Sequence, residues 1–443
     1  MKPNVLWIFT DQHRGQAMSC AGDPNIETPH LDRLAAEGVR FSRAYSNTPI
    51  CTPARATVYT GQYITSHGAL ANHYPLLPGR SPQMAEVMAK AGYRTCHFGK
   101  WHLSGGTANQ HYVSPYFRPG WQEWIGWECM HNRGDAGTYF DSAYCEGTGH
   151  DIKVHRIDKF QPDWLTDRTI EWIGTQTPDV PWFHVVSIET PHAPCDFPDN
   201  VPEEYHRMFE SKELSLRPNF GEKRREDLDG FIRGYYSHVK NIDDNVGRIM
   251  HTLEQTDQLE NTIVFYLSDH GDFMGSHGRG GKGRPEEEAS NIPFIVRLPR
   301  HERSSHTADA FIGLVDLMST TLGLCGVPVP DSCEGTDLSS LILERTASGP
   351  DYVYMQYENS FFAQTKAEGY WRAIRRGDWM YCENLAQGPF QLFNLANDPF
   401  EMNNLVADPG HARVRAELRD LAVEKANSLG DDFFKRVEAV HPA

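Results

Sequence analysis

The chain has 443 residues, enough for roughly three domains, or for one large α/β domain and a smaller one. Hydrophobic residues make up 39% and charged residues 23%, a globular composition that argues against extensive disorder. The formal net charge of −17 argues against nucleic acid or an anionic membrane as a partner, because either would require basic patches. A surface this acidic is compatible with a monomer or a homo-oligomer.

The N-terminal segment and the cysteines indicate the cellular compartment and exclude some classes of protein. The apolar run at residues 5–9 is too short for a signal peptide core, and no small-residue cleavage site follows it. We therefore expect a cytoplasmic protein, or a periplasmic or secreted one if a signal peptide was removed. The 9 cysteines are odd in number and none are paired as C-x-x-C, which excludes a disulfide scaffold and a zinc ribbon.

Short apolar runs alternate with helical patterns over the first 300 residues. Buried strands are expected at residues 5–10, 93–98, 182–188, 262–267 and 293–298. Helices are expected from Pro29 to Gly38, from Pro82 to Gly92 and over residues 227–259. Strands separated by helices predict an α/β fold, with a large, mostly parallel sheet sandwiched by helices.

The pattern changes after about residue 340. Residues 352–357, 370–374, 379–382 and 391–395 alternate like antiparallel strands, and residues 412–429 predict a helix. We therefore expect a large domain at residues 1–340 and a small C-terminal α+β domain with an antiparallel sheet at residues 341–443.

Polar clusters follow several of the expected strands. They are Thr10-Asp11-Gln12-His13, Gly99-Lys100-Trp101-His102, Glu189-Thr190-Pro191-His192 and Ser268-Asp269-His270-Gly271. In open α/β sheets, ligands bind at the carboxyl ends of the strands. The clusters therefore predict one site at this edge of the sheet.

Two of these clusters carry metal-binding residue types. Asp11, Gln12 and Asp269 offer oxygen atoms, and His270 offers an imidazole. Two carboxylates brought together need a cation or a proton between them, and a divalent metal suits this donor set. The alternative is that Asp11 and Asp269 are solvated caps at the ends of their strands.

Basic side chains would surround that metal. Lys100, His102, His192 and Lys282 would add positive charge or hydrogen-bond donors, which suits an anionic substrate group. Each of them taken singly is more often structural, and His192 lies between prolines.

A further motif is Cys51-Thr52-Pro53-Ala54-Arg55. Pro53 is expected to begin a short helix that ends at Gly61, so Cys51 would lie at a helix N-terminus, where an anion is stabilised. A thiol there would be acidic and reactive. The alternative is a buried structural cysteine.

Together these motifs resemble the formylglycine-dependent sulfatases of the alkaline-phosphatase-like superfamily. The C-x-P-x-R segment at residues 51–55 is similar to the maturation motif of that family, and Thr60-Gly61 follows it as in the family. The same order of Asp11, the Gly99–His102 cluster and Asp269-His270-Gly271 makes the resemblance specific. It extends from Asn4 to about Asn404.

The resemblance implies a nucleophile and a metal. A formylglycine-generating enzyme would convert Cys51 to Cα-formylglycine, whose hydrate attacks sulfur and later expels sulfate. Asp11, Gln12, Asp269, His270 and the modified Cys51 would bind one divalent metal that acts as a Lewis acid.

The resemblance also implies roles for the remaining residues. Asp269 would accept the proton of the attacking hydroxyl, and His102 would take the proton when the hemiacetal collapses. Arg55 and Lys100 would steady the formylglycine, and Lys100 would also contact substrate. His192 and Lys282 would hold the sulfate and assist the leaving oxygen. Asn72 matches a substrate contact of phosphonate monoester hydrolases.

Gln12 and His270 depart from the commoner Asp and Asn of the family. This pair occurs in choline-sulfatase-like and phosphonate monoester hydrolase members. It removes one ligand charge and adds a nitrogen, which leaves Mn²⁺ and Mg²⁺ open beside the expected Ca²⁺. The latter hydrolases carry Tyr and Thr in place of Lys100 and His102, so this chain favours sulfate esters. The alternatives are a phosphonate monoester or phosphodiester hydrolase, and an inactive anion-binding relative in which Cys51 stays a thiol.

The expected substrate is a sulfated carbohydrate or small alcohol. Aromatic residues of a long loop at 105–151, namely Trp121, Trp124, Trp127 and Tyr139, either stack on a sugar or aryl ring or pack beneath the loop. In the tail, Glu358, Asn359 and Arg372 are candidates for the rim of the pocket.

Overall fold

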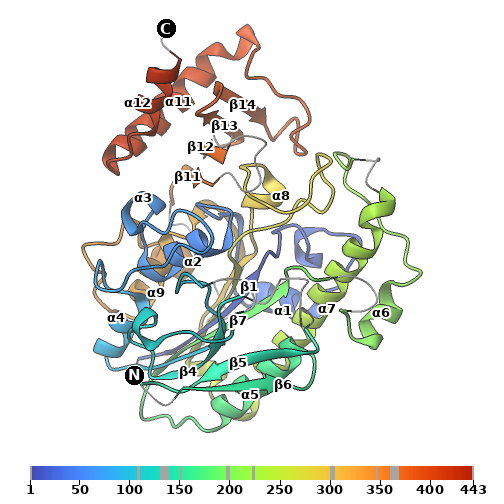
Figure 1. Ribbon diagram of the computed structural model, residues 1–443, viewed down its shortest axis with the longest axis vertical. Helices are drawn as coiled ribbons and strands as arrows, with labels where there is room; N and C mark the ends of the chain where they lie inside the picture. The colour runs from blue at the N-terminus through green and yellow to red at the C-terminus, as the bar shows by residue number, and fades with distance from the viewer. Residues whose placement is uncertain are drawn as a thin grey trace.

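The structure is a computed structural model. It describes residues 2–106, 110–129, 139–149, 152–195, 200–221, 225–299, 305–345, 348–359 and 369–441. A large sheet flanked by helices forms one part of the molecule, and a smaller sheet with two helices lies at one end of it (Figure 1). The predicted fold class is confirmed.

The large sheet has ten strands in the order β10-β2-β9-β8-β1-β7-β3-β4-β5-β6. Its parallel centre consists of β8 (Thr262–Ser268), β1 (Asn4–Asp11), β7 (Trp182–Pro191), β3 (Arg94–Lys100) and β4 (Glu123–Trp127). On one side, β9 (Phe294–Arg297) runs antiparallel to β8 and to β2 (Val39–Tyr45), which pairs in parallel with β10 (His306–Gly313). On the other, β5 (Ser142–Glu146) and β6 (Lys153–Ile157) add antiparallel pairs.

Strand β1 shows why the sheet is covered on both faces. Every residue of β1 is buried, as expected for a central strand of an α/β sheet. Trp7 and Phe9 belong to one hydrophobic core, whereas Leu6 and Ile8 belong to another. Because successive side chains of a strand point to opposite faces, the two cores lie on opposite faces of the sheet.

Different helices contribute side chains to the two hydrophobic cores. Helices α1 (Pro29–Glu37), α5 (Gln161–Gly174) and α7 (Arg225–Gln255) contribute to the core that contains Leu6. Helices α2 (Cys51–Thr60), α4 (Met84–Lys90) and α9 (Asp316–Leu324) contribute to the core that contains Trp7. Shorter helices are α3 (Ile64–His67), α6 (Glu203–Phe209), α8 (Glu287–Ser290) and α10 (Ser339–Leu343). Among the described residues, no helix is both long and apolar enough to cross a membrane.

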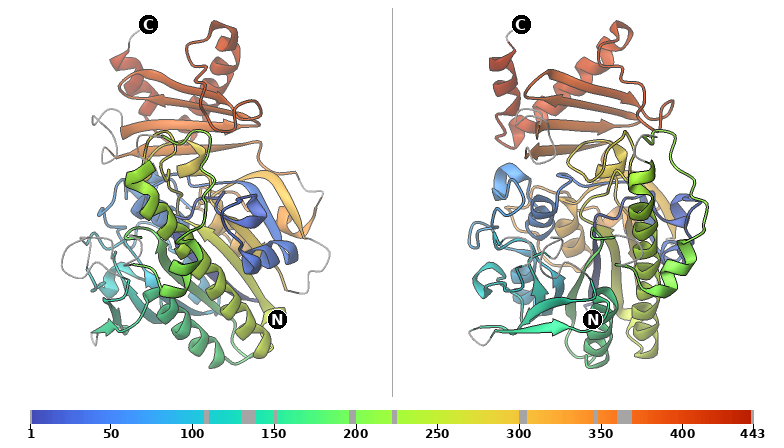
Figure 2. Two further views of the ribbon diagram at one scale, coloured as in Figure 1. Left: turned by 90° about the vertical axis from the view of Figure 1, so that its right-hand side faces the viewer. Right: turned by 45° about the vertical axis from the view of Figure 1, so that its right-hand side comes forward.

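The C-terminal sheet is antiparallel and follows chain order. Its strands are β11 (Tyr352–Glu358), β12 (Tyr370–Arg376), β13 (Trp379–Asn384) and β14 (Gly388–Asn394). One face packs on α11 (Ala412–Ser428) and α12 (Phe433–Val440), which lie together beside the sheet (Figure 2). The other face packs on Ile50, the residue before Cys51. The boundary at residue 340 remains a prediction.

Several local expectations are wrong. Residues 105–151 were expected to form a loop, but the described part contains β4 and β5. Strands β2, β6 and β10 were not expected from the sequence. They lie at or near the edges of the sheet, where strands are less apolar and therefore harder to predict. Helix α4 begins at Met84 instead of Pro82, because Gln83 and Glu86 form a capping box. Helix α2 begins at Cys51, before Pro53.

Candidate active site

The predicted convergence of the polar clusters is confirmed. Strand β1 ends at Asp11 and β3 ends at Lys100, while Asp269 directly follows β8. Because β3, β7, β1 and β8 are parallel neighbours, their carboxyl ends share one edge of the sheet. Helix α2 brings Cys51 to the same edge, since the Cys51 thiol lies against residues from two of these clusters.

Cys51 is buried at the first position of α2. Its Sγ lies 3.2 Å from Lys282 Nζ, 3.3 Å from His270 Nε2 and 3.7 Å from Asp11 Oδ1. Burial and the Asp11 carboxylate raise the pKa of the Cys51 thiol to about 11. The expectation of an acidic thiol is therefore wrong for the unmodified side chain, because burial outweighs the helix N-terminus.

Arg55 lies one turn further along α2 and joins several elements. Its guanidinium donates to Asp269 Oδ2 and Asp11 Oδ2, each at 3.1 Å. It also donates to the Lys100 carbonyl at 3.1 Å and to Ser187 Oγ at 2.8 Å. The positive charge of Arg55 therefore holds the carboxylates of β1 and of the β8 end beside each other.

Lys100 is a second buried cation. Its Nζ lies 2.7 Å from Asp11 Oδ2 and 3.2 Å from Glu189 Oε1. Burial favours the neutral amine, but these carboxylates keep the pKa of Lys100 well above its usual value. Glu189 also accepts a hydrogen bond from Trp127 Nε1 at 2.7 Å. Glu189 stands in one of the polar clusters of the sequence, but its residue type alone did not indicate a role.

Gln12 connects Lys282 to the site. The Gln12 backbone has a φ of 70°, and its N–H donates to Asp269 Oδ1 at 3.0 Å. Its Oε1 accepts from Lys282 Nζ at 2.5 Å, and its Nε2 donates to Asp272. Asp272, buried and three residues after Asp269, is a further polar residue that the sequence analysis did not single out.

Four side chains form a cluster that fits a metal ion. Ligand atoms of Asp11, Cys51, Asp269 and His270 all lie within 4.8 Å of one another, and all four residues are buried. Asp11 and Asp269 are therefore not solvated caps, and that alternative is wrong. His270 Nδ1 lies 3.0 Å from the Gly271 carbonyl, to which it donates, so its Nε2 presents a lone pair to the cluster.

The electrostatics of the cluster also favour a cation. Burial and the neighbouring Asp11 raise the pKa of Asp269 to about 7. Burial alone would raise the pKa of Asp11 too, but Lys100 and His192 hold it well below its usual value. Burial lowers the pKa of His270, which keeps its imidazole neutral. Carboxylate and neutral imidazole donors match the ligands of Ca²⁺, Mn²⁺ or Mg²⁺.

Asn72 and His102 both contact Thr52, the residue after Cys51. Asn72 Oδ1 accepts from the Thr52 backbone N–H at 3.0 Å, and the His102 carbonyl accepts from Thr52 Oγ1 at 2.9 Å. The His102 ring lies 5.2 Å from the ring of exposed His73, which the sequence analysis did not identify.

His192 is buried and directly follows β7, so it lies at the same edge of the sheet. Its Nδ1 lies 2.7 Å from the Ala193 carbonyl, and its own carbonyl accepts from Tyr139 at 2.8 Å. The structure thus brings all the predicted site residues to one edge of the sheet, while their roles remain predictions.

The aromatic residues of the 105–151 region pack inside the protein. Trp121, Trp124, Trp127 and Tyr139 are all buried. Trp124 stacks on His97 with ring centroids 4.6 Å apart, and Trp121 stacks on Phe183 at 5.5 Å. The interpretation that they bind a sugar ring is wrong for this structure.

The tail residues are arranged around an ion pair. Arg372 is buried against Asp431 at 2.5 Å and Glu358 at 2.8 Å, which ties β12 to the C-terminal helices instead of placing it at a pocket rim. Asn359 donates its backbone N–H to Gly369 at 2.9 Å, and the residues between them lie outside the described part of the chain.

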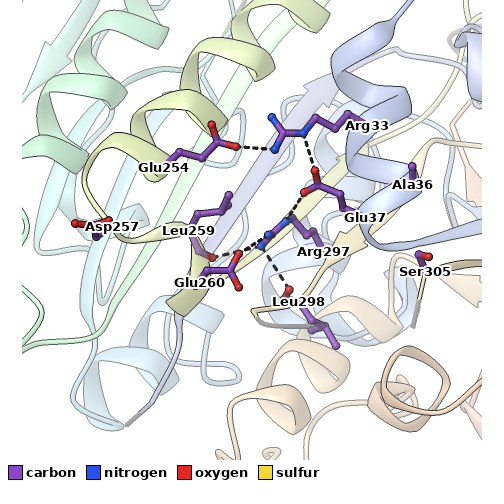
Figure 3. A pocket seen from close by; sticks show the side chains of 10 residues that line it. All are labelled: Arg33, Ala36, Glu37, Glu254, Asp257, Leu259, Glu260, Arg297, Leu298 and Ser305. Atoms are coloured by element: carbon purple, nitrogen blue, oxygen red, sulfur yellow. Dashed lines mark hydrogen bonds and ion pairs between the residues drawn. The ribbon is translucent and has the colours of Figure 1, made fainter. Parts of the chain in front are cut away.

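A cavity of about 790 Å³ lies away from these residues (Figure 3). Its lining includes Leu259 and Glu260 of the short 3-10 helix Leu259–Asn261 that leads into β8, so it lies at the amino edge of the sheet, opposite the cluster. Both of its arginines are paired with acidic neighbours: Arg33 with Glu37 and Glu254, and Arg297 with Glu37 and Glu260.

Comparison with known proteins identifies the family. The sulfatase family model matches residues 3–327, and the model of the C-terminal region of N-sulphoglucosamine sulphohydrolase matches residues 275–428. The chain is 34% identical over 443 residues to the ulvan-active sulfatase of Formosa agariphila, covering 98% of this chain and 83% of the relative. It is 28% identical to the arylsulfatase of Clostridium perfringens, covering 89% and 90% of the two chains.

Solved structures show the same fold. A putative sulfatase from Bacteroides fragilis superposes with a TM-score of 0.84 at 26% identity, covering 98% of both chains. The phosphonate monoester hydrolase of Agrobacterium radiobacter superposes with a TM-score of 0.79 at 24% identity, covering 98% of this chain and 96% of that one, and shares the fold. The chain belongs to the sulfatase family and is an enzyme that hydrolyses sulfate esters.

Proposed function

We propose that this sulfatase acts on a sulfated carbohydrate, with a formylglycine derived from Cys51 and one divalent metal. The observation that carries the proposal is the position of Cys51, buried at the start of α2 and in contact with both Lys282 and the metal-binding cluster. Its place among Asp11, Asp269 and His270, at the start of the C-x-P-x-R segment, supports the proposal that position 51 carries the nucleophile.

The cofactors would supply two things when present: a hydrated aldehyde at position 51 as the nucleophile, and a Lewis acid. Asp11, Asp269 and His270 would hold the metal with Gln12, whose Oε1 faces Lys282 in the structure. We expect Ca²⁺, because most of these donors are oxygens, with Mn²⁺ or Mg²⁺ as the alternatives that metal analysis would distinguish.

The protein side chains divide the remaining tasks. Lys282 Nζ, 3.2 Å from Cys51 Sγ, provides positive charge where an ester sulfate must approach position 51. Asp269 lies in the same cluster as Cys51, which supports its proposed part in accepting the proton of the attacking hydroxyl at position 51. Arg55 and Lys100 both contact Asp11 and keep it ionised.

Two histidines complete the set. His102 adjoins the start of α2 through its contact with Thr52, which supports its proposed part in proton transfer at position 51. His192 lies close enough to lower the pKa of Asp11, which supports its proposed part in holding the sulfate.

The carbohydrate class is supported by relatives. One is named an ulvan-active sulfatase. Another, 26% identical over 79% of this chain, is the N-acetylglucosamine-6-O-sulfatase of Bacteroides thetaiotaomicron. Both names refer to carbohydrate substrates, and we infer the same class here.

The first experiment is the mass of the tryptic peptide at residues 44–55, from protein co-expressed with a formylglycine-generating enzyme. We expect a peptide whose mass shows that the CH₂SH side chain of Cys51 has been replaced by an aldehyde. The Cys51→Ala variant should yield no aldehyde-containing peptide. Full turnover by protein that contains only the thiol would contradict the proposal.

A substrate panel tests the class of ester. It would contain sulfated mono- and oligosaccharides, 4-nitrophenyl sulfate and a 4-nitrophenyl phosphonate monoester. We expect the highest kcat/KM for a sulfated sugar. A higher value for the phosphonate ester would favour the phosphonate hydrolase alternative, and no turnover by fully converted enzyme would favour the inactive anion-binding relative.

A further inference from the structure

The C-terminal sheet contacts the loop that carries Lys282. Trp371 on β12 donates from its Nε1 to the Gly283 carbonyl at 3.1 Å. The Gly283 N–H donates to the Pro49 carbonyl at 3.0 Å, two residues before Cys51. Gly283 has a φ of 91°, which favours glycine. Both backbone groups of Gly283, the residue after Lys282, are therefore hydrogen-bonded, one to the segment before Cys51 and one to β12.

A second set of bonds holds the next part of this loop, around α8. Arg375 on β12 pairs with Glu287 and with Glu401, each at 2.9 Å, and Glu401 accepts the Glu287 backbone N–H at 2.8 Å. Gln391 on β14 donates to Glu286 Oε1 at 2.7 Å. Figure 1 shows α8 next to the C-terminal sheet, where these contacts form. The loop after Lys282 is therefore attached to the small sheet.

We propose that Trp371 is a positioning residue that sets the location of Lys282 for the reaction. This inference rests on the role of Lys282 in the proposed function. Lys282 has a long, flexible side chain, and its Nζ must lie close to position 51 to bind a sulfate oxygen. A small displacement of its backbone would lower the rate, because catalysis depends strongly on the position of such a charge.

Trp371→Phe tests the inference. The variant keeps an aromatic ring to stack on Tyr357, whose ring lies 5.4 Å away at an interplanar angle of 10°, but it removes the N–H donor. Trp379→Phe is the matched control, because Trp379 is on the adjacent strand of the same sheet and packs on His411. We expect Trp371→Phe to lower kcat/KM about tenfold on the best panel substrate, as for a lost hydrogen bond, and Trp379→Phe to leave it unchanged.

A double-mutant cycle distinguishes positioning from general damage. In the Lys282→Ala background, Trp371→Phe should cause no further loss, because the residue that it positions is absent. An unchanged kcat/KM for Trp371→Phe alone, or the same tenfold loss in both backgrounds, would overturn the inference while leaving the proposed function intact. Near-normal turnover of Lys282→Ala would instead contradict the proposed function itself.

A second variant covers the case in which Trp371→Phe does not fold, as judged by circular dichroism and Tm. Gln391→Met keeps the length of the side chain but removes the bond to Glu286. We expect a smaller loss of about threefold that likewise disappears in the Lys282→Ala background. A loss that persists there would overturn the inference.

Discussion

Arg55 and Asp269 form an ion pair with a Nε–Oδ2 distance of 3.1 Å in which neither side chain is exposed to solvent. The same guanidinium pairs with Asp11 at 3.1 Å. The two carboxylates come from chain positions 258 residues apart, so Arg55 balances charges that the fold itself brings together. Removal of a partner from a buried pair leaves uncompensated charge, which is costly.

We therefore expect Arg55→Met to lower the free energy of unfolding by about 3–5 kcal/mol, measured by urea denaturation at pH 7. The control is Arg207→Met, in a solvent-exposed i,i+4 pair with Glu203, which should not shift the urea midpoint measurably. Equal midpoints for Arg55→Met and the wild-type protein would show that the pair does not stabilise the site.

Lys100→Ala should lower turnover by about two to three orders of magnitude. Asp11 would lose the cation that lies 2.7 Å from its Oδ2, and Glu189 would lose one of its partners. The measurement is kcat at saturating substrate, with circular dichroism to confirm the fold. Turnover within a few-fold of the wild-type value would exclude a part for Lys100 in the reaction.

His270→Ala should weaken retention of the divalent metal. Its Nε2 is the imidazole nitrogen that faces Asp11 and Asp269, and its Nδ1 is occupied by the Gly271 carbonyl. Metal content after gel filtration, measured by inductively coupled plasma mass spectrometry, should fall well below that of the wild type. His251→Ala, a change at an exposed histidine on α7, should leave it unaltered. Equal metal content in both variants would rule out His270 as a ligand.

The site was largely predictable because of one geometric rule. Asp11, Lys100 and Asp269 each stand at the end of an apolar run, and the carboxyl ends of parallel strands share an edge. No knowledge of loop conformation was needed to bring them together. The parallel centre of the sheet was predicted separately, from apolar runs that alternate with helical patterns.

The features that could not be predicted from the sequence depend on contacts between segments that are far apart in the chain. The contact of Trp371 with Gly283 joins β12 to a loop 88 residues earlier in the chain and leaves no periodic signal. The raised pKa of Cys51 results from burial and from the Asp11 carboxylate, which a motif at a helix start does not show. Strand β2 carries Arg40, Ser42 and Arg43 among its apolar residues, so it lacks the continuous apolar run by which the central strands were predicted.

The buried imidazole of His67, which is not part of the metal-binding cluster, should make the free energy of unfolding depend on pH. Its Nδ1 accepts the Ala69 backbone N–H at 3.1 Å, and its Nε2 lies 3.1 Å from Thr57 Oγ1. Protonation of Nδ1 would break the first of these bonds inside the core. Burial accordingly lowers the pKa of His67 from 6.5 to about 3.

The sign of the effect follows from this shift. Below pH 6.5 the unfolded chain binds a proton at His67 that the folded chain does not, so stability is lost as the pH falls from 6.5 towards 3, by about 1.4 kcal/mol per pH unit. His67→Gln should remove this contribution, so that the free energy of unfolding falls less steeply between these limits than in the wild type. Urea denaturation at a series of pH values measures both slopes. His251→Gln should retain the wild-type slope, and an unchanged slope in His67→Gln would show that His67 titrates normally in the folded protein.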